Sequence, residues 1–205
     1  MSHIFLASPH MSDEGYEQKY IKEAFDTNWI APLGKNVNEF ENEMKDKLGA
    51  KAAVALSCGT AAIHMAIKSL GIKQDDIVFC QSLTFSASAN PITYENATPV
   101  FIDSDEYWNM SSTALRKGLE KYKDNLPKAV IVVHLYGLAA NIKEIKEICD
   151  EYGVPLIEDA AESLGTTVNG QYTGTFGDYG IISFNGNKII TSSGGGMLLF
   201  NTDDA

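Results

Sequence analysis

The sequence has 205 residues, of which 44% are hydrophobic, and its 16 basic and 27 acidic side chains give a net charge of −11. This composition predicts one sizeable buried core, whereas the negative charge, without any run of Lys or Arg, argues against nucleic acid or an anionic membrane as a partner. No stretch approaches the roughly 18 apolar residues of a membrane helix, and three widely spaced cysteines suit reduced thiols, so we expect a cytoplasmic protein.

Residues 1–50 are predicted to form a helical lead-in. Residues 13–29 have the pattern of a mostly exposed helix that begins with acidic residues, which suit the positive end of a helix dipole. The loop 30–34 separates this helix from a second one, whose apolar face is formed by Val37, Phe40, Met44 and Leu48.

Residues 51–205 alternate short apolar runs with segments of helical period. Seven runs are predicted to be strands, at 52–57, 77–81, 99–102, 129–134, 154–158, 179–184 and 196–200. Helices are expected between them, as where Ile142, Ile145, Cys149 and Tyr152 form one apolar face. The alternation is typical of an α/β fold, here a mostly parallel seven-stranded sheet with helices on both faces. Because the chain stops directly after a strand-like run, we expect it to be the front portion of a longer protein.

Polar residues at the strand ends are the functional candidates, because ligands of open α/β sheets bind outside the carboxyl ends of the strands. The turn "SCGTAA", at 57–62, leads into an Ala-rich helix. The N–H groups of Thr60 and Ala61, at the start of that helix, would form an anion-binding site. Taken alone, an ordinary helix cap explains these residues as well.

Two carboxylates, Glu158 and Asp159, follow a strand that is apolar enough to be buried on both faces. A buried carboxylate is costly without a cationic or hydrogen-bonding partner. Three interpretations stay open at this point: a Mg²⁺ site formed together with Glu162, a structural ion pair, or a carboxylate that holds a protonated ring nitrogen.

Lys188 favours the third interpretation. It is the only basic residue in the last quarter of the chain, and it stands in a loop of small residues just before three consecutive glycines. A lysine near a buried aspartate and an anion-binding helix start is what a pyridoxal phosphate site requires. Phe85, at another strand end, is placed to stack on the pyridine ring, although a single Phe is more typical of the core.

Several segments resemble, in order and spacing, those of the DegT-type (DegT/DnrJ) nucleotide-sugar aminotransferases. They include "GTAAIHMAI", "TFSASANPI", "HLYG", "EDAAESLG" and "GTFGDYGIISFNGNKIITSSGGGML". The resemblance extends to the lead-in and covers nearly the whole chain. It implies that residues 51–205 are the large, cofactor-binding domain of a fold-type I pyridoxal phosphate enzyme, whose smaller C-terminal domain is absent from this chain.

The resemblance also implies roles for single residues. Lys188 would form the Schiff base and move the proton, and Asp159 would pair with the pyridinium nitrogen. Glu162 would lie near the 3′-oxygen of the cofactor, where many relatives have Gln. The other implied contacts are Phe85 on the ring and Thr60, Ala61 and Ser183 at the phosphate. No metal ion is implied.

The expected reaction is the transfer of an amino group from L-glutamate to the C4 ketone of a nucleotide-linked 4-keto-6-deoxy sugar. The wording "NGNKIITSSGGGM" resembles most the bacillosamine-pathway enzymes, which act on UDP-4-keto-6-deoxy-GlcNAc in surface-glycan biosynthesis. Such enzymes are homodimers, and we expect the same of the full-length protein. The alternatives are a non-catalytic, truncated fragment of this fold and a Mg²⁺-dependent α/β hydrolase that uses Glu158, Asp159 and Glu162.

Overall fold

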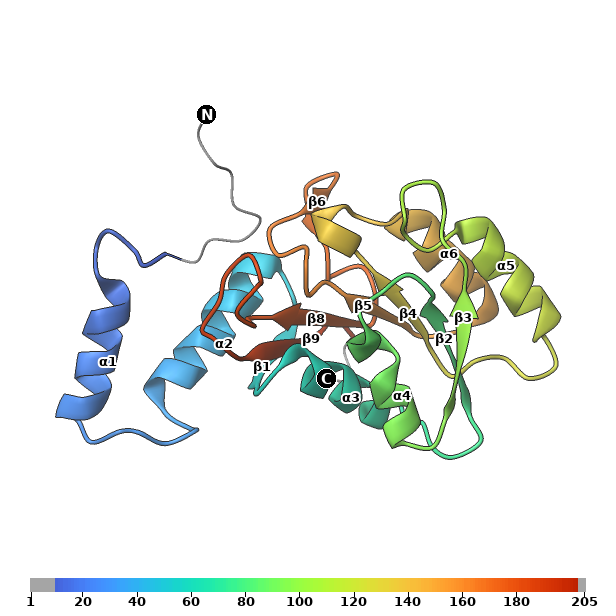
Figure 1. Ribbon diagram of the computed structural model, residues 1–205. Coiled ribbons are helices and arrows are strands. Elements are labelled where there is room, and N and C mark those ends of the chain that lie inside the picture. Colours follow the sequence, from blue (N-terminus) through green and yellow to red (C-terminus); the bar gives the residue numbers. More distant parts are fainter. Residues whose placement is uncertain (1–9, 203–205) are drawn as a thin grey trace.

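The computed structural model describes residues 10–202 and begins with two helices that precede the sheet (Figure 1). The first helix, α1 (Tyr16–Asp26), buries no residue, as predicted, and is shorter than the expected 13–29. The second helix, α2 (Lys35–Leu48), buries Met44 and Leu48 against the sheet. Phe40 lies on the same predicted face but remains 38% exposed, and its ring makes an edge-to-face contact with Phe184.

A seven-stranded sheet forms the centre of the fold, in the order β1-β9-β8-β5-β4-β2-β3. Strand β9 runs antiparallel to its neighbours β1 and β8, and all other pairs are parallel, which confirms the predicted mostly parallel α/β sheet. The strands are β1 (Ala52–Leu56), β2 (Ile77–Gln81), β3 (Thr98–Ile102), β4 (Val130–Val133), β5 (Leu156–Asp159), β8 (Tyr179–Ser183) and β9 (Gly196–Phe200).

Several strand ends differ by one residue from the predicted bounds, and two differences are larger. Strand β5 begins at Leu156 rather than at residue 154, because Pro155 has no N–H group to donate to the ladder. A short hairpin, β6 (Thr167–Val168) and β7 (Gln171–Tyr172), was not predicted. Its turn consists of Asn169 and Gly170, both at positive φ, and Asn-Gly is the sequence signal that would have revealed it.

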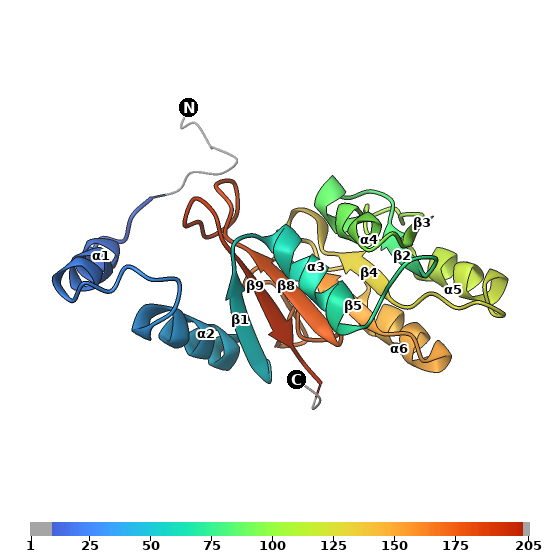
Figure 2. The same cartoon turned by 90° about the horizontal axis from the view of Figure 1, so that it is seen from below.

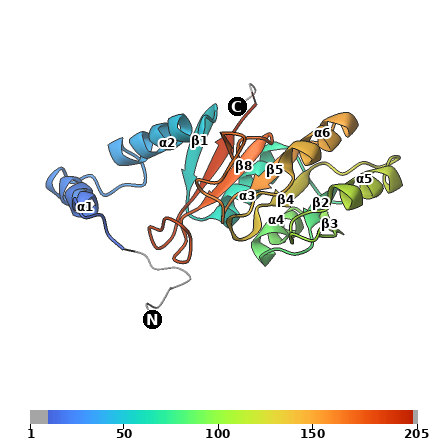
Figure 3. The same ribbon diagram turned by 90° about the horizontal axis from the view of Figure 1, so that it is seen from above.

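Helices cover both faces of the sheet, as predicted (Figures 2 and 3). On one face lie α3 (Gly59–Ser69) and α4 (Asn90–Tyr94), over a core that includes Ile157, Ile181 and Leu198. On the other face lie α2, α5 (Ser112–Lys121) and α6 (Ile142–Tyr152). Two short 3-10 turns, η1 (Ser86–Ser88) and η2 (Leu135–Gly137), complete the loops at the strand ends. Within residues 10–202, no helix combines the length and the apolar character needed to span a membrane.

Two glycines let the loop after β7 pack directly onto the sheet. A Cβ atom at Gly180, in β8, would lie 1.9 Å from the carbonyl oxygen of Gly174. A Cβ atom at Gly177 would lie 2.6 Å from the carbonyl oxygen of Leu156. Both obstacles are backbone atoms, which cannot rotate away, so these positions admit only glycine for as long as the loop keeps its place.

We therefore expect Gly180→Ala to lower the free energy of unfolding by about 3 kcal/mol, because the added methyl group displaces the loop from β8. The matched control is Gly186→Ala, since a Cβ atom at Gly186 would meet no atom within 4 Å. Urea unfolding of both variants measures the difference. Equal midpoints for the two variants would show that the loop is not packed as described.

Candidate active site

The carboxyl ends of the parallel strands, the start of α3 and the loop after β8 enclose a cavity of about 250 Å³. Six of the seven site residues predicted from the sequence line it: Thr60, Phe85, Asp159, Glu162, Ser183 and Lys188. They come from four separate stretches of the chain, which the order of the strands brings to one edge of the sheet. Ala61, the seventh, does not line the cavity.

Asp159 is the buried acid of this cavity. It ends β5 and is only 6% exposed. Its carboxylate accepts hydrogen bonds from the Ser88 hydroxyl at 2.6 Å and from the Ala161 N–H at 3.2 Å. Burial raises the pKa of Asp159 above its ordinary value, against the lowering effect of the Ser88 bond and of the Lys188 charge. Within residues 10–202 no cation forms an ion pair with it, so this carboxylate has capacity left for a cationic ligand.

Lys188 lies across the cavity, in the loop that follows β8. Its Nζ atom is 3.2 Å from Oε1 of Glu162, and both side chains are largely shielded from solvent. The other carboxylate oxygen of Glu162 accepts the backbone N–H of Tyr136 at 2.9 Å. Glu162 is thereby fixed between the lysine and the "HLYG" turn, so the position of the amine depends on that turn.

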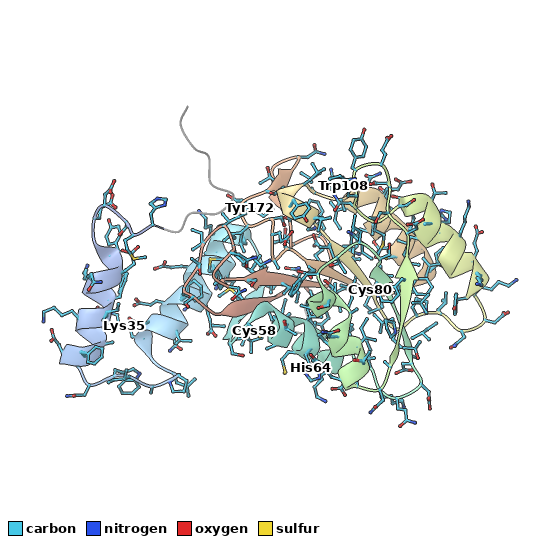
Figure 4. The ribbon with its side chains drawn as sticks, viewed as in Figure 1. Lys35, Cys58, His64, Cys80, Trp108 and Tyr172 are labelled. Carbon is cyan, nitrogen blue, oxygen red and sulfur yellow. The ribbon has the colours of Figure 1, made fainter. Side chains whose placement is uncertain are left out.

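The start of α3 forms the opposite wall (Figure 4 labels Cys58 there). Cys58, which also lines the cavity, caps the helix, and its Sγ atom accepts the N–H of Ala61 at 3.4 Å. Gly59 lets the helix start approach β8, because a Cβ atom there would lie 3.1 Å from the Cβ atom of Ser183. Thr60 and Ser183 therefore stand together beside the first helical turn, where an anion is stabilised by N–H groups and the helix dipole.

Glu158 precedes Asp159 but faces the other side of the sheet, because successive strand residues point to opposite faces. Its two oxygens accept four hydrogen bonds, which come from the N–H groups of Gly174, Phe176 and Gly177 and from Nε2 of His134. The N–H of Ala140 points to Nδ1 of His134, so the imidazole proton is on Nε2. Glu158 is thus fully used in holding the loop 174–177 and the "HLYG" turn.

The Mg²⁺ interpretation of these carboxylates is therefore wrong for Glu158. Glu158 and Asp159 point away from each other, and Glu162 is engaged by Lys188 and Tyr136. Among the described residues, no three His, Cys, Asp or Glu side chains are arranged to hold a metal ion.

Sequence reasoning missed Ser88, which is the direct partner of Asp159. Ser88 is fully buried in η1, and its hydroxyl is also 2.7 Å from that of Thr84. The signal was present in "SLTFSASA", where hydroxyl residues follow strand β2 at the same sheet edge. Nothing in the spacing distinguished Ser88 from its neighbours.

The residues that line the cavity fit a flat, cationic heterocycle that carries an anionic group. Asp159 offers a buried negative charge, and Thr60, Ser183 and the helix start offer an anion site. Phe85 is 73% exposed, so its ring face is free to stack. The Lys188 amine completes the set as a nucleophile.

We expect Glu158→Gln to lower the free energy of unfolding by about 3 kcal/mol, because either orientation of the amide would point its NH₂ group at two N–H donors. Glu147→Gln, on the exposed side of α6, is the matched control for loss of one negative charge. Urea unfolding compares the two. A Glu158→Gln variant as stable as its control would refute the assigned hydrogen bonds.

Asp159→Asn should stabilise the protein in the absence of any ligand. A carboxyl group with a raised pKa in the folded state contributes stability below its unfolded pKa and loses it as the pH rises through the folded pKa. Asn cannot ionise, and its oxygen can accept the Ala161 N–H while its NH₂ group donates to the Ser88 hydroxyl, so its advantage over wild type should grow as the pH rises above about 4. Thermal unfolding across this range measures the effect, with exposed Asp124→Asn as the control. If the difference in stability between Asp159→Asn and wild type did not change with pH, burial would not have raised the pKa of Asp159.

Comparisons with known proteins agree with this geometry. The family model described as the DegT/DnrJ/EryC1/StrS aminotransferase family matches residues 12–205. EpsN of Bacillus subtilis (strain 168), whose name ascribes to it pyridoxal phosphate-dependent aminotransferase activity, is 61% identical over 98% of this chain and 52% of its own length. The GDP-perosamine synthase of Vibrio cholerae is 42% identical over 93% of this chain and 51% of its own length.

Solved structures show the same fold. The aminotransferase TlmJ from Streptoalloteichus hindustanus superposes with a TM-score of 0.89 at 32% identity, over 99% of this chain and 54% of that protein. A DegT DnrJ EryC1 StrS aminotransferase from Brucella abortus gives a TM-score of 0.82 at 32% identity, over 95% of this chain and 56% of that protein. The chain thus spans about half the length of the relatives that it matches. On the strength of the sequence match and of the cavity, the chain belongs to the DegT/DnrJ/EryC1/StrS aminotransferase family.

Proposed function

We propose that the protein uses pyridoxal phosphate to transfer an amino group from an amino acid to the ketone of a nucleotide-linked sugar. The observation that carries this proposal is the meeting, in one cavity, of the Lys188 amine and the buried Asp159, which forms no ion pair within residues 10–202. Membership of an aminotransferase family and the name of EpsN support it. Residues 51–205 would then be the cofactor-binding domain and residues 1–50 its lead-in.

When bound, the cofactor supplies an electron sink that stabilises negative charge on the carbon that gains or loses the amino group. Asp159 would hold the ring nitrogen protonated, which maintains that sink. Thr60, Ser183 and the first turn of α3 would bind the phosphate, and Phe85 would cover one face of the ring. Ala61 belongs to the same helical turn, and its own N–H group is bonded to Cys58, so it would support the phosphate site as part of that turn.

Lys188 would do the proton chemistry. Its amine must first lose a proton before it can attack a carbonyl carbon, and the carboxylate of Glu162, 3.2 Å away, is placed to accept that proton. Once it is no longer bonded to the cofactor, the same amine would carry a proton from the carbon that loses the amino group to the carbon that gains it. Tyr136 keeps Glu162 in place throughout through its backbone N–H.

For the acceptor we propose a nucleotide-linked 4-keto-6-deoxy sugar, with UDP-4-keto-6-deoxy-GlcNAc as the first candidate and L-glutamate as the donor. A GDP-linked sugar is the second candidate, because relatives 39–42% identical to this chain are named GDP-perosamine synthases. The full-length protein is proposed to be a cytoplasmic homodimer. Incubation of that protein with glutamate and each ketosugar, followed by mass spectrometry, distinguishes the two. Failure to aminate either sugar would refute this choice of acceptor.

We expect Lys188→Ala to abolish covalent attachment of the cofactor. The wild-type protein, incubated with pyridoxal phosphate and reduced with borohydride, should gain one phosphopyridoxyl group on the peptide that contains Lys188. Lys143→Ala, which removes an exposed lysine of α6, should leave that adduct unchanged. Mass spectrometry of the digested proteins measures both. A stoichiometric adduct in Lys188→Ala would sink the assignment, and no adduct in either protein would support a non-catalytic fragment.

A further inference from the structure

A second hollow, of about 420 Å³, adjoins the cofactor cavity at its Glu162 side. The two share Thr84, Phe85, Leu135 and Glu162. The remaining lining of the second hollow is Leu83, Trp108 and Tyr136, so aromatic and aliphatic side chains dominate it. A molecule that reached the Lys188 amine from this side would pass over these rings. We call this space the aromatic hollow.

The two outer aromatic residues have an unusual backbone. Trp108 and Tyr136 have φ values of 71° and 53°, in the left-handed region that bulky side chains rarely adopt. The other non-glycine residues with positive φ within the described chain are Asn28, Asp75, Asn96, Asn169 and Ser193. Those five are small polar residues, most of which tolerate this conformation well. The two aromatic exceptions line the same hollow, and strained residues of this kind gather at functional sites.

Buried amides hold both strained residues in place. The side chain of Asn109, next to Trp108, accepts the N–H of Leu135 at 3.0 Å and donates to the carbonyl of Leu138 at 3.1 Å. It thereby ties the loop of Trp108 to the turn of Tyr136. Gln81, fully buried at the end of β2, donates to the Trp108 carbonyl at 3.3 Å.

This arrangement presents aromatic surface to solvent instead of burying it. Trp108 remains 59% exposed and Tyr136 77% exposed, and their ring centroids lie 6.4 Å apart at 73° (Figure 4 labels Trp108). The folding of the loops therefore gains little from these two side chains, although each costs backbone strain. Preorganised, exposed rings in an edge-to-face arrangement suit a ligand that offers flat apolar surface.

The position and lining of the aromatic hollow indicate which part of a nucleotide sugar it would bind. No Lys or Arg lines it, which disfavours the diphosphate. The ketone of the acceptor belongs to the sugar ring itself, so the ring nearest the Lys188 amine must be the hexose, whereas the base is separated from it by a diphosphate and a ribose. We propose that the aromatic hollow binds the hexose ring of the acceptor, with its C–H faces against Trp108 and Tyr136. This inference rests on the proposed function.

Trp108→Gly tests the proposal, because glycine relieves the backbone strain while removing the ring. Isothermal titration calorimetry with UDP-N-acetylglucosamine and GDP-mannose should show binding of at least one of them to the wild-type protein. Its dissociation constant should rise about tenfold in Trp108→Gly, as expected for loss of one buried aromatic contact. Binding of the corresponding nucleoside diphosphate alone should be unchanged. The matched control is Tyr107→Ala, an exposed aromatic outside the hollow, which should bind like wild type.

Thermal unfolding separates a binding role from a structural one. Trp108→Gly should be at least as stable as wild type, whereas a ring needed for packing would make it less stable. The proposal is overturned if neither nucleotide sugar binds the wild-type protein, or if Trp108→Gly binds the nucleotide sugar as tightly as wild type does. It is also overturned if Trp108→Gly binds the free nucleoside diphosphate more weakly by the same factor, because Trp108 would then contact the base rather than the hexose. Borohydride reduction of Trp108→Gly should still give the Lys188 adduct, so failure of the hexose site is distinguishable from failure of the cofactor site.

Discussion

Two adjacent buried carboxylates at the end of β5 organise the site, and they do so because strand geometry points them to opposite faces. Glu158 receives four hydrogen bonds, from three backbone N–H groups and His134, and is saturated. Asp159 receives only two, from Ser88 and Ala161. The first is therefore a structural anchor for the surrounding loops. The second is a buried carboxylate that forms no ion pair within residues 10–202, and its ionised form is costly unless a ligand supplies a cation.

The anchor and the reactive groups are connected through the chain. His134, held by Glu158, precedes the turn that carries Tyr136, whose N–H fixes Glu162 beside the Lys188 amine. The same turn is tied by Asn109 to the loop of Trp108. One hydrogen-bonded unit thus connects the acid, the amine and the walls of the aromatic hollow. The burial that raises the pKa of Asp159 and the left-handed backbone of Trp108 and Tyr136 are each locally destabilising, and the rest of this unit must compensate for them.

The sequence allowed much of this fold to be predicted, since buried parallel strands appear as apolar runs and their ends must share one edge. Lys188 and Asp159 were identifiable because a single charge in an apolar setting requires an explanation. The functions of Glu158 and Ser88 were not identifiable, because each depends on contacts between residues far apart in sequence, up to 71 positions for Ser88 and Asp159. Ala61 does not line the cavity, and Cys58 accepts its N–H, a contact between near neighbours that the sequence alone did not reveal. The positive φ angles of Trp108 and Tyr136 could not be predicted, because neither composition nor hydrophobic periodicity depends on them.

In the proposed function, Asp159 would hold the ring nitrogen of the bound cofactor in its protonated form. Nitrogen-15 NMR of the protein loaded with ring-labelled pyridoxal phosphate tests it most directly, because the chemical shift of that nitrogen reports whether it carries a proton. We expect a protonated nitrogen in the wild-type protein at a pH where the ring of the free cofactor is neutral, and an unprotonated nitrogen in Asp159→Asn. A neutral ring nitrogen in wild type, or a protonated one in Asp159→Asn, would contradict it.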